Sequence, residues 1–132
     1  MTSVTSDIKD LLVEKIEELE FGRNLFIGNE PEAPVDTVVL FDQPGAGSQL
    51  LLTPVEDSRY EYSSLHIRIR NYKYTDAMQM AHRIISVLHN TGNKVINGTL
   101  YTLVESLDSP AILDYQNNNP RVIMSFAVQR NT

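Results

Sequence analysis

The sequence predicts an α+β domain: a mixed, mostly antiparallel sheet of about five or six strands, with two main helices packed on one face. Two observations predict it. Residues 60–90 carry a two-residue apolar period followed by a helical one. The other strand-like stretches are joined by turn sequences and do not alternate regularly with helices, which argues against an all-parallel sheet. With 132 residues, we expect a single domain spanning 1–132.

The first helix is expected to begin at Ser6, whose hydroxyl would cap it, and to end near Leu19. Its inward stripe has helical spacing and consists of Ile8, Leu11, Leu12, Ile16 and Leu19. Glycines and prolines then punctuate residues 21–34, which predicts a connector. Within it, the apolar residues 25–27 either pack down or form a short strand.

Three strands are predicted next. Residues 37–41 are β-branched, aliphatic and aromatic, with little polar content, so this strand is expected to be buried on both faces. The Pro-Gly and the second glycine in residues 42–48 predict a turn or loop. Residues 50–52 form a short strand, and a longer one runs from Tyr60 to Arg70. In this last strand the apolar residues Leu65, Ile67 and Ile69 alternate with His66, Arg68 and Arg70.

The second helix is expected to start at Thr75 and Asp76 and to stop at residues 90–92. Its inward stripe is Met78, Ala81, Ile85 and Leu88. A broken strand over residues 94–107 follows. Residues 111–115 and 122–130 then face each other across a hairpin-type loop at 116–120.

Composition excludes several classes of function. The chain has no cysteine, which excludes disulfides, thiolate metal sites and a cysteine nucleophile. Its apolar runs are too short to cross a bilayer, and its first residues are too polar for a secretory signal, so we expect no membrane partner and a cytoplasmic site of synthesis. A net charge of −6 opposes nucleic-acid binding by the whole surface.

The sequence predicts no catalytic, metal or cofactor-binding residue, and no enzyme. His82 and His89 are seven positions apart on a helix, about 10 Å of rise, too far to share an ion. Gly45 and Gly47 begin like a phosphate loop, but neither the third glycine nor a Gly-Lys follows. Ser48 lacks the flanking pattern of a nucleophile elbow.

The polar face of the strand from Tyr60 to Arg70 admits two interpretations. Alternation places His66, Arg68 and Arg70 on one side, about 7 Å apart. Either this is a solvated face paired with carboxylates such as Glu61 or Glu105, or it is a basic surface for an acidic partner or another copy of the chain. Tyrosines flank the region, and tyrosine with arginine is typical of interface hot spots.

Three stretches carry a resemblance to a known family. They are the proline-flanked acidic segment, strand and glycine loop of residues 28–47; the basic strand and helix from Leu65 to Leu88; and the closing strands of residues 100–128. In this order they resemble the tail terminator proteins of long-tailed bacteriophages, also described as minor capsid or tail completion proteins.

The resemblance implies a protomer that closes into a ring, usually a hexamer, on the end of the tail tube, stops tail elongation and forms the tail-to-head joining surface. It implies no catalysis and no cofactor. The implied partners are the protein itself, the tail tube protein and the head–tail connector or neck protein. The implied location is the head-proximal end of the tail in the virion, after synthesis in the host bacterial cytoplasm.

We expect the ring contact to use residues of the basic strand, its tyrosines and the glycine loop, with the acidic first helix of the next copy as a complement. These residues are His66, Arg68, Arg70, Tyr60, Tyr62, Tyr72, Asp42, Pro44, Gly45 and Gly47. The loop from Asp42 to Leu50 is a candidate for ordering only in the assembled tail.

Two alternatives remain open at this point. One is a head-completion or connector (neck) subunit of the same kind of particle. The other is a cellular small-ligand-binding α+β domain, which a buried, substrate-sized cavity with converging polar groups inside one subunit would favour.

Overall fold

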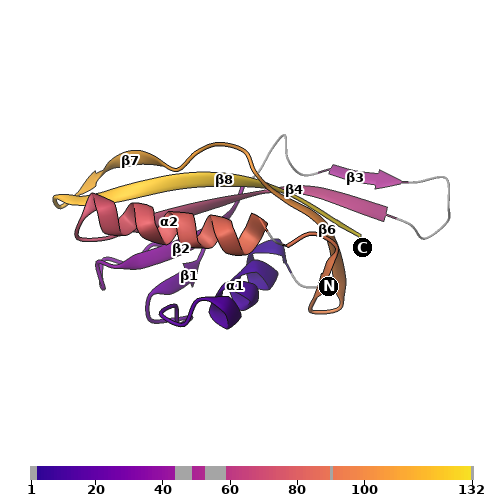
Figure 1. The fold of residues 1–132 in the computed structure, drawn as a ribbon, viewed down its shortest axis with the longest axis horizontal. Helices are drawn as coiled ribbons and strands as arrows, with labels where there is room; N and C mark the ends of the chain where they lie inside the picture. The colour runs from indigo at the N-terminus through magenta and orange to yellow at the C-terminus, as the bar shows by residue number, and fades with distance from the viewer. Residues whose placement is uncertain (1–2, 44–48, 53–58, 90, 132) are drawn as a thin grey trace.

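The computed structural model describes residues 3–43, 49–52, 59–89 and 91–131. In chain order, the two helices and eight strands of the described part are α1 (Val4–Lys15), β1 (Leu25–Ile27), β2 (Thr37–Gln43), β3 (Gln49–Leu52), β4 (Arg59–Arg70), α2 (Tyr74–His89), β5 (Lys94–Ile96), β6 (Thr99–Ser106), β7 (Ala111–Gln116) and β8 (Asn119–Asn131) (Figure 1).

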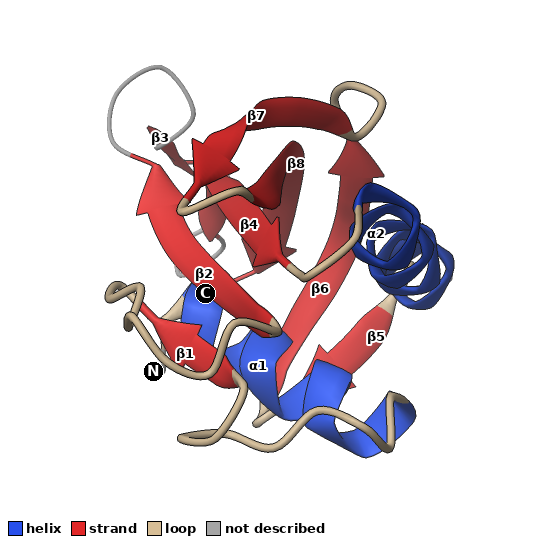
Figure 2. Ribbon diagram, turned by 90° about the vertical axis from the view of Figure 1, so that its left-hand side faces the viewer, coloured by secondary structure: helices blue, strands red, loops and turns tan. Residues whose placement is uncertain are grey.

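All the strands belong to one sheet, whose main path runs β1-β2-β4-β8-β6-β5. β3 extends the edge of β4 where that strand begins, and β7 does the same for β8. Every pairing is antiparallel except that of β1 with β2. Figure 2 shows the sheet strongly curled. The predicted α+β class with a mixed, mostly antiparallel sheet is confirmed, and the predicted broken strand is β5 followed by β6.

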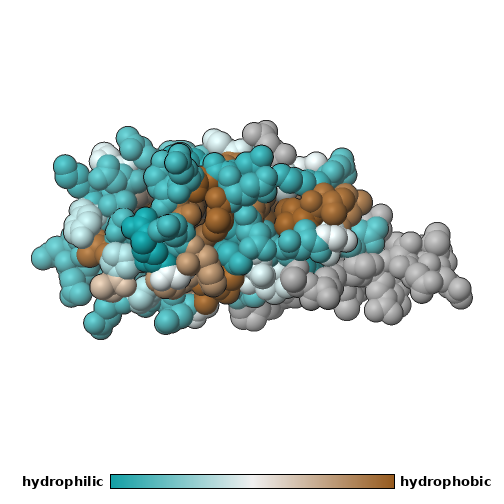
Figure 3. Space-filling view, turned by 90° about the horizontal axis from the view of Figure 1, so that it is seen from below, coloured by the Kyte–Doolittle hydropathy of each residue, from teal (hydrophilic) through white to brown (hydrophobic). Residues whose placement is uncertain are grey.

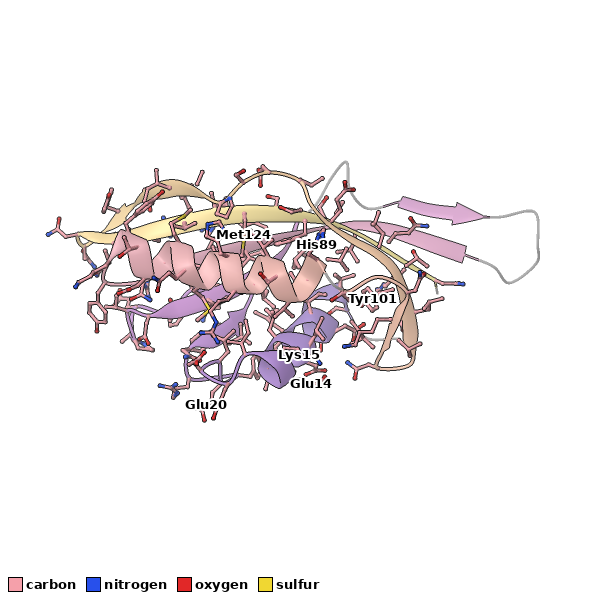
Figure 4. The ribbon with its side chains drawn as sticks, viewed as in Figure 1. Glu14, Lys15, Glu20, His89, Tyr101 and Met124 are labelled. Carbon is pink, nitrogen blue, oxygen red and sulfur yellow. The ribbon has the colours of Figure 1, made fainter. Side chains whose placement is uncertain are left out.

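The core forms on the face of β4 and β8 that the sequence alternation predicted. These two strands pair over their whole length, with Ile67 opposite Met124 and Leu65 opposite Phe126. Apolar side chains of both strands are buried here against α1 and α2. The helices therefore lie on the same face of the sheet, and Figure 4 labels Met124 between α2 and β8.

The first helix differs from its prediction at both ends. Ser3, rather than Ser6, is the N-cap, and its hydroxyl accepts the N–H of Ser6 at 3.2 Å. The helix ends at Lys15, yet Ile16 and Leu19 remain buried. The helical spacing correctly predicted that these two side chains are buried. It did not predict where the helix ends, because a turn that follows a helix can place apolar residues in the core at the same spacing.

The second helix has the predicted limits but a slightly rotated inward stripe. Its fully buried residues are Ala77, Ala81, Ile84 and Leu88. The predicted stripe members Met78 and Ile85 are only partly buried against the core.

Two hairpins of the sheet have turns of only two residues. Asn97 and Gly98 connect β5 to β6, and Asn117 and Asn118 connect β7 to β8, all four with positive φ between 50° and 81°. A two-residue hairpin turn with positive φ at both central positions suits the twist of the strands, and asparagine and glycine adopt that conformation most easily. The loop expected at residues 116–120 is thus only two residues long.

Candidate functional site

The face of β4 opposite the helices carries His66, Arg68 and Arg70, as alternation predicts, but these side chains differ in accessibility. Arg70 is only 4% exposed, whereas the side chain of Arg68 is 34% exposed. The strand therefore does not present a uniform basic surface to solvent.

Arg70 is committed to contacts inside the subunit. Its guanidinium donates to the backbone carbonyls of Pro31, Pro34 and Val35 at 2.5, 3.0 and 3.0 Å. It also donates to Gln116 at 2.7 Å and to Glu30 at 3.3 Å. These contacts hold the connector of residues 30–35 on the sheet. β2 is buried on both faces from Thr37 to Leu40, as predicted for this part of the strand, whereas Phe41 is half-buried and Asp42 is exposed.

Glu30 is the carboxylate around which the arginines gather. It lies 2.9 Å from Arg121, 3.3 Å from Arg70 and 3.8 Å from Arg68. Arg121 also pairs with Asp114 at 2.5 Å. The hydrogen bonds from Arg121 lower the pKa of Asp114, and those to Asp114 raise the pKa of Arg121. We call Glu30, Arg68, Arg70 and Arg121 the arginine cluster.

Of the two carboxylates predicted to pair with this face, Glu105 is not the partner found for the arginines, and Glu61 is not tested. Glu30 comes from the connector, a place that strand alternation cannot reveal. Glu105 lies on β6, two strands away from β4, opposite Ala127 of the intervening β8. The side chain of Glu61 lies outside the described part of the structure.

His66 packs within the same face, where its surroundings favour the neutral imidazole. Its Nε2 accepts a hydrogen bond from Nε of Arg68 at 3.3 Å. Its ring meets Phe41 edge-on at 5.8 Å, and the Arg68 guanidinium lies 5.0 Å from the Phe41 ring. Burial, followed by the charge of Arg68, lowers the pKa of His66. Among the described residues, no group of three or more acidic, histidine or cysteine side chains could hold a metal ion.

The other predicted interface residues divide into three groups. Tyr72 is 64% exposed between β4 and α2. Asp42 is also exposed, and its carboxylate accepts the Thr5 hydroxyl at 3.2 Å. Pro44, Gly45 and Gly47 lie outside the described residues, and of Tyr60 and Tyr62 only the backbone pairing with β3 and β8 is described.

The acidic segment after the first helix is largely compensated within the subunit. Glu18 pairs with Arg83 of α2 at 2.5 Å, and this hydrogen bond lowers the pKa of Glu18. Glu20 pairs with Arg23. Glu18 and Glu20, which were expected to contribute to the attraction of a neighbouring copy, thus have partners in their own chain, as Glu30 does at the arginine cluster.

Sequence reasoning missed a buried polar cluster that connects α1 to the sheet. The hydroxyl of Tyr101 donates to the carboxylate of Asp7, and Arg130 lies 3.5 Å from that carboxylate and 3.2 Å from the hydroxyl. All three residues are buried, and burial is the main cause that raises the pKa of Tyr101. Arg130 continues the inward alternation of β8, so a charged residue at a core position was the available signal.

Exposed aromatic residues gather where α2 begins. Tyr72 and Tyr74 are 64% and 44% exposed. Tyr115 of β7 is opposite Pro120 in the sheet, and the carbonyl of Pro120 accepts the N–H of Asn71 at 3.3 Å. The tyrosines of both segments therefore lie near Pro120, at the left of Figure 1, and we call Tyr72, Tyr74 and Tyr115 the aromatic end. Only Tyr72 had been predicted to matter.

A groove lies at the other end of α2, where it passes α1. It has a volume of about 450 Å³, opens to solvent and is lined by Leu11, Lys15, Ser86, Val87, Thr91 and Lys94; we call it the α1–α2 groove. Figure 4 shows Lys15 on α1 beneath the part of α2 that ends at His89. Seen from the side of α1, hydrophobic residues form patches between hydrophilic ones (Figure 3).

The α1–α2 groove is open to solvent and is not the buried cavity with converging polar groups that would favour a small-ligand-binding domain. A second hollow of about 280 Å³ is lined by Arg70, Gln116 and four neighbouring residues and is mostly polar. No helix in the described part of the chain is long and apolar enough to span a bilayer.

Comparisons with known proteins agree with the fold. No curated protein sequence matches the chain. A chain from the virion of a native gene transfer agent particle superimposes with a TM-score of 0.65 at 10% identity, and the match covers 100% of both chains. At this identity the likeness shows a shared fold.

A family model gives the identity of the chain. The model, described as "Bacteriophage tail terminator protein", matches residues 12–131. The match extends from within α1 to the last residue of β8. It includes the arginine cluster, the aromatic end and the α1–α2 groove apart from Leu11. Because almost the whole sequence fits, the chain belongs to the bacteriophage tail terminator family.

Proposed function

We propose that this structural protein of the phage tail closes into a ring on the end of the tail tube, stops the addition of tube subunits and forms the surface to which the head joins. The observation that carries the proposal is the match of residues 12–131 to the tail terminator family. The ring is expected to be a hexamer at the head-proximal end of the tail. Its partners are further copies of the chain, the tube protein and a connector or neck protein.

The surface of the subunit supports assembly as its task. Long exposed apolar side chains occur on β7, on the turn before α2 and on β5, among them Ile112, Tyr72 and Val95. β7 is an edge strand that is exposed along almost its whole length. Its register shift between Ile112 and Asp114 and the charge of Asp114 limit strand pairing at this edge. Its exposed apolar side chains Ile112 and Leu113 are the kind of surface that an assembly covers.

A ring also explains how elongation would stop. Each contact in a ring is heterologous, joining one patch of a subunit to a different patch of the next, and closure leaves no free patch in the plane. One face of the ring would bind the last layer of tube subunits. The opposite face would lack the surface that another tube subunit recognises, and it would instead meet the connector.

Electron microscopy of particles assembled without this protein tests the proposal. We expect tail tubes of uncontrolled length that are not joined to heads. Tails of normal length beside leaky or unfilled heads would contradict tail termination and would favour the head-completion or connector function instead.

A further inference from the structure

The two surfaces at opposite ends of α2 are complementary to each other. We propose that the contact between neighbouring copies in the ring places Tyr72, Tyr74 and Asp76 of one copy in the α1–α2 groove of the next. This inference rests on the proposed ring and adds the identity of the two surfaces that close it.

The donor segment carries exposed aromatic side chains and one negative charge. Tyr72 lies just before α2 and Tyr74 is its first residue, and both side chains are exposed. Asp76 lies in the first turn of the helix, is exposed and forms no ion pair with the described residues. A tyrosine has an apolar ring and a polar hydroxyl, so it suits a groove that is apolar inside and polar at its rim.

The groove has that composition. Leu11 and Val87 supply apolar surface, and Lys15 and Lys94 supply positive charge. Lys94 makes no ion pair within the described part of the chain. Lys15 is 3.9 Å from the exposed carboxylate of its neighbour Glu14, the longest ion-pair distance among the described residues. Both lysines are therefore available to the carboxylate of Asp76 from another copy.

The contact cannot form within one subunit. Tyr74 and Ser86 are twelve positions apart on the same straight helix, a rise of about 18 Å. The donor segment and the groove of one copy thus face away from each other along α2. A contact that joins them must link two copies head to tail, which is the heterologous geometry that a ring needs.

Mixing two defective variants tests this contact. The donor variant carries Tyr72→Ser and Tyr74→Ser, and the groove variant carries Lys15→Glu and Lys94→Glu. Each retains one intact surface, so neither should assemble alone, with the concentration for half-assembly raised about tenfold or more, as for loss of hot-spot residues. Their mixture should form a heterodimer and stop there. The readout is mass by light scattering, with and without tail tubes.

A charge swap provides the rescue. Asp76→Lys added to the groove variant restores opposite charges across every contact, and we expect this triple variant to recover assembly. Two matched controls have comparable exposure away from both surfaces: Leu107→Ser for the loss of an exposed apolar side chain and Arg23→Glu for charge reversal. Both should assemble like wild type. Circular dichroism checks that every variant folds.

The outcomes separate this contact from the ring itself. If wild type assembles and folded donor and groove variants assemble equally well, the contact is wrong and the ring stands. If folded variants fail alone but their mixture also stays monomeric, the two surfaces do not meet each other. If wild type forms no oligomer alone or on tail tubes, the ring and this contact both fall.

Discussion

The arginine cluster and the aromatic end differ in how far each is satisfied within one subunit. In the cluster, Arg70 alone donates to five acceptors, and Glu30 lies against three arginines. At the aromatic end, Tyr72 and Tyr74 project into solvent. The comparison teaches that a charged strand face can be satisfied inside the subunit although its sequence resembles an interface, whereas the exposed tyrosines have no such contacts to explain them and are the residues that we propose for the ring contact.

The largest expected effect concerns the buried cluster of Asp7, Tyr101 and Arg130. Replacing Asp7 with alanine leaves the buried charge of Arg130 without this carboxylate, so we expect the free energy of unfolding to fall by about 3–5 kcal/mol. Urea unfolding measures it. The double variant Asp7→Leu, Arg130→Met removes both charges and should recover much of the loss. A loss below about 1 kcal/mol for Asp7→Ala would contradict a structural role for the pair.

The next effect distinguishes two arginines of the same strand face. Arg70→Ala removes the hydrogen bonds that hold the connector, and we expect a loss of about 2–3 kcal/mol in the free energy of unfolding. Arg68→Ala is the matched control, because Arg68 is partly exposed and 3.8 Å from Glu30; its cost should stay within about 1 kcal/mol. If both variants lost the same amount of unfolding free energy, burial would not determine how much each arginine contributes to stability.

The aromatic end should show the opposite behaviour. Tyr72→Ser and Tyr74→Ser together should change the free energy of unfolding by only about 0.5 kcal/mol, because exposed side chains contribute little to folding. The same variant should lose assembly. Thermal unfolding and light scattering on one sample measure both. A variant that unfolds much more easily than wild type would place these tyrosines in the fold instead of the contact.

The smallest effect is the titration of His66. Its pKa is lowered, so the folded state favours neutral imidazole; the resulting stability is present above the ordinary pKa of 6.5 and is lost as the pH falls below it. Proton NMR should find His66 titrating below 6.5. Arg68→Gln removes a nearby positive charge and should move the pKa of His66 upward. A wild-type pKa at or above 6.5 would mean that this face is more open than its contacts indicate.

The sequence alone predicted the structural features that follow from a regular spacing of apolar residues. The alternation of Leu65, Ile67 and Ile69 and the helical spacing near Leu88 gave the fold class, the inward faces and most element limits. A spacing rule has no information on a partner far away in the chain, so Glu30 could not be assigned to Arg70, 40 residues later. Likewise, Asp7 and Arg130 are separated by 123 residues and meet only after the sheet forms.

The site was predictable only in part for the same reason. Among the residues predicted for an interface, Tyr72 is exposed and Arg70 is buried, and the residue types alone do not distinguish the two. Accessibility, however, depends on the connector that covers Arg70 and on the hairpin that carries Tyr115. Neither the position of the connector nor that of the hairpin follows from the spacing of apolar residues in the sequence.

The most direct test is the length distribution of tails assembled with three forms of the protein and measured by electron microscopy. Our account predicts normal lengths with wild type and with Arg68→Ala, and overlong tubes without heads when Tyr72→Ser and Tyr74→Ser are combined. Tails of normal length, joined to heads, with the combined tyrosine variant would contradict it.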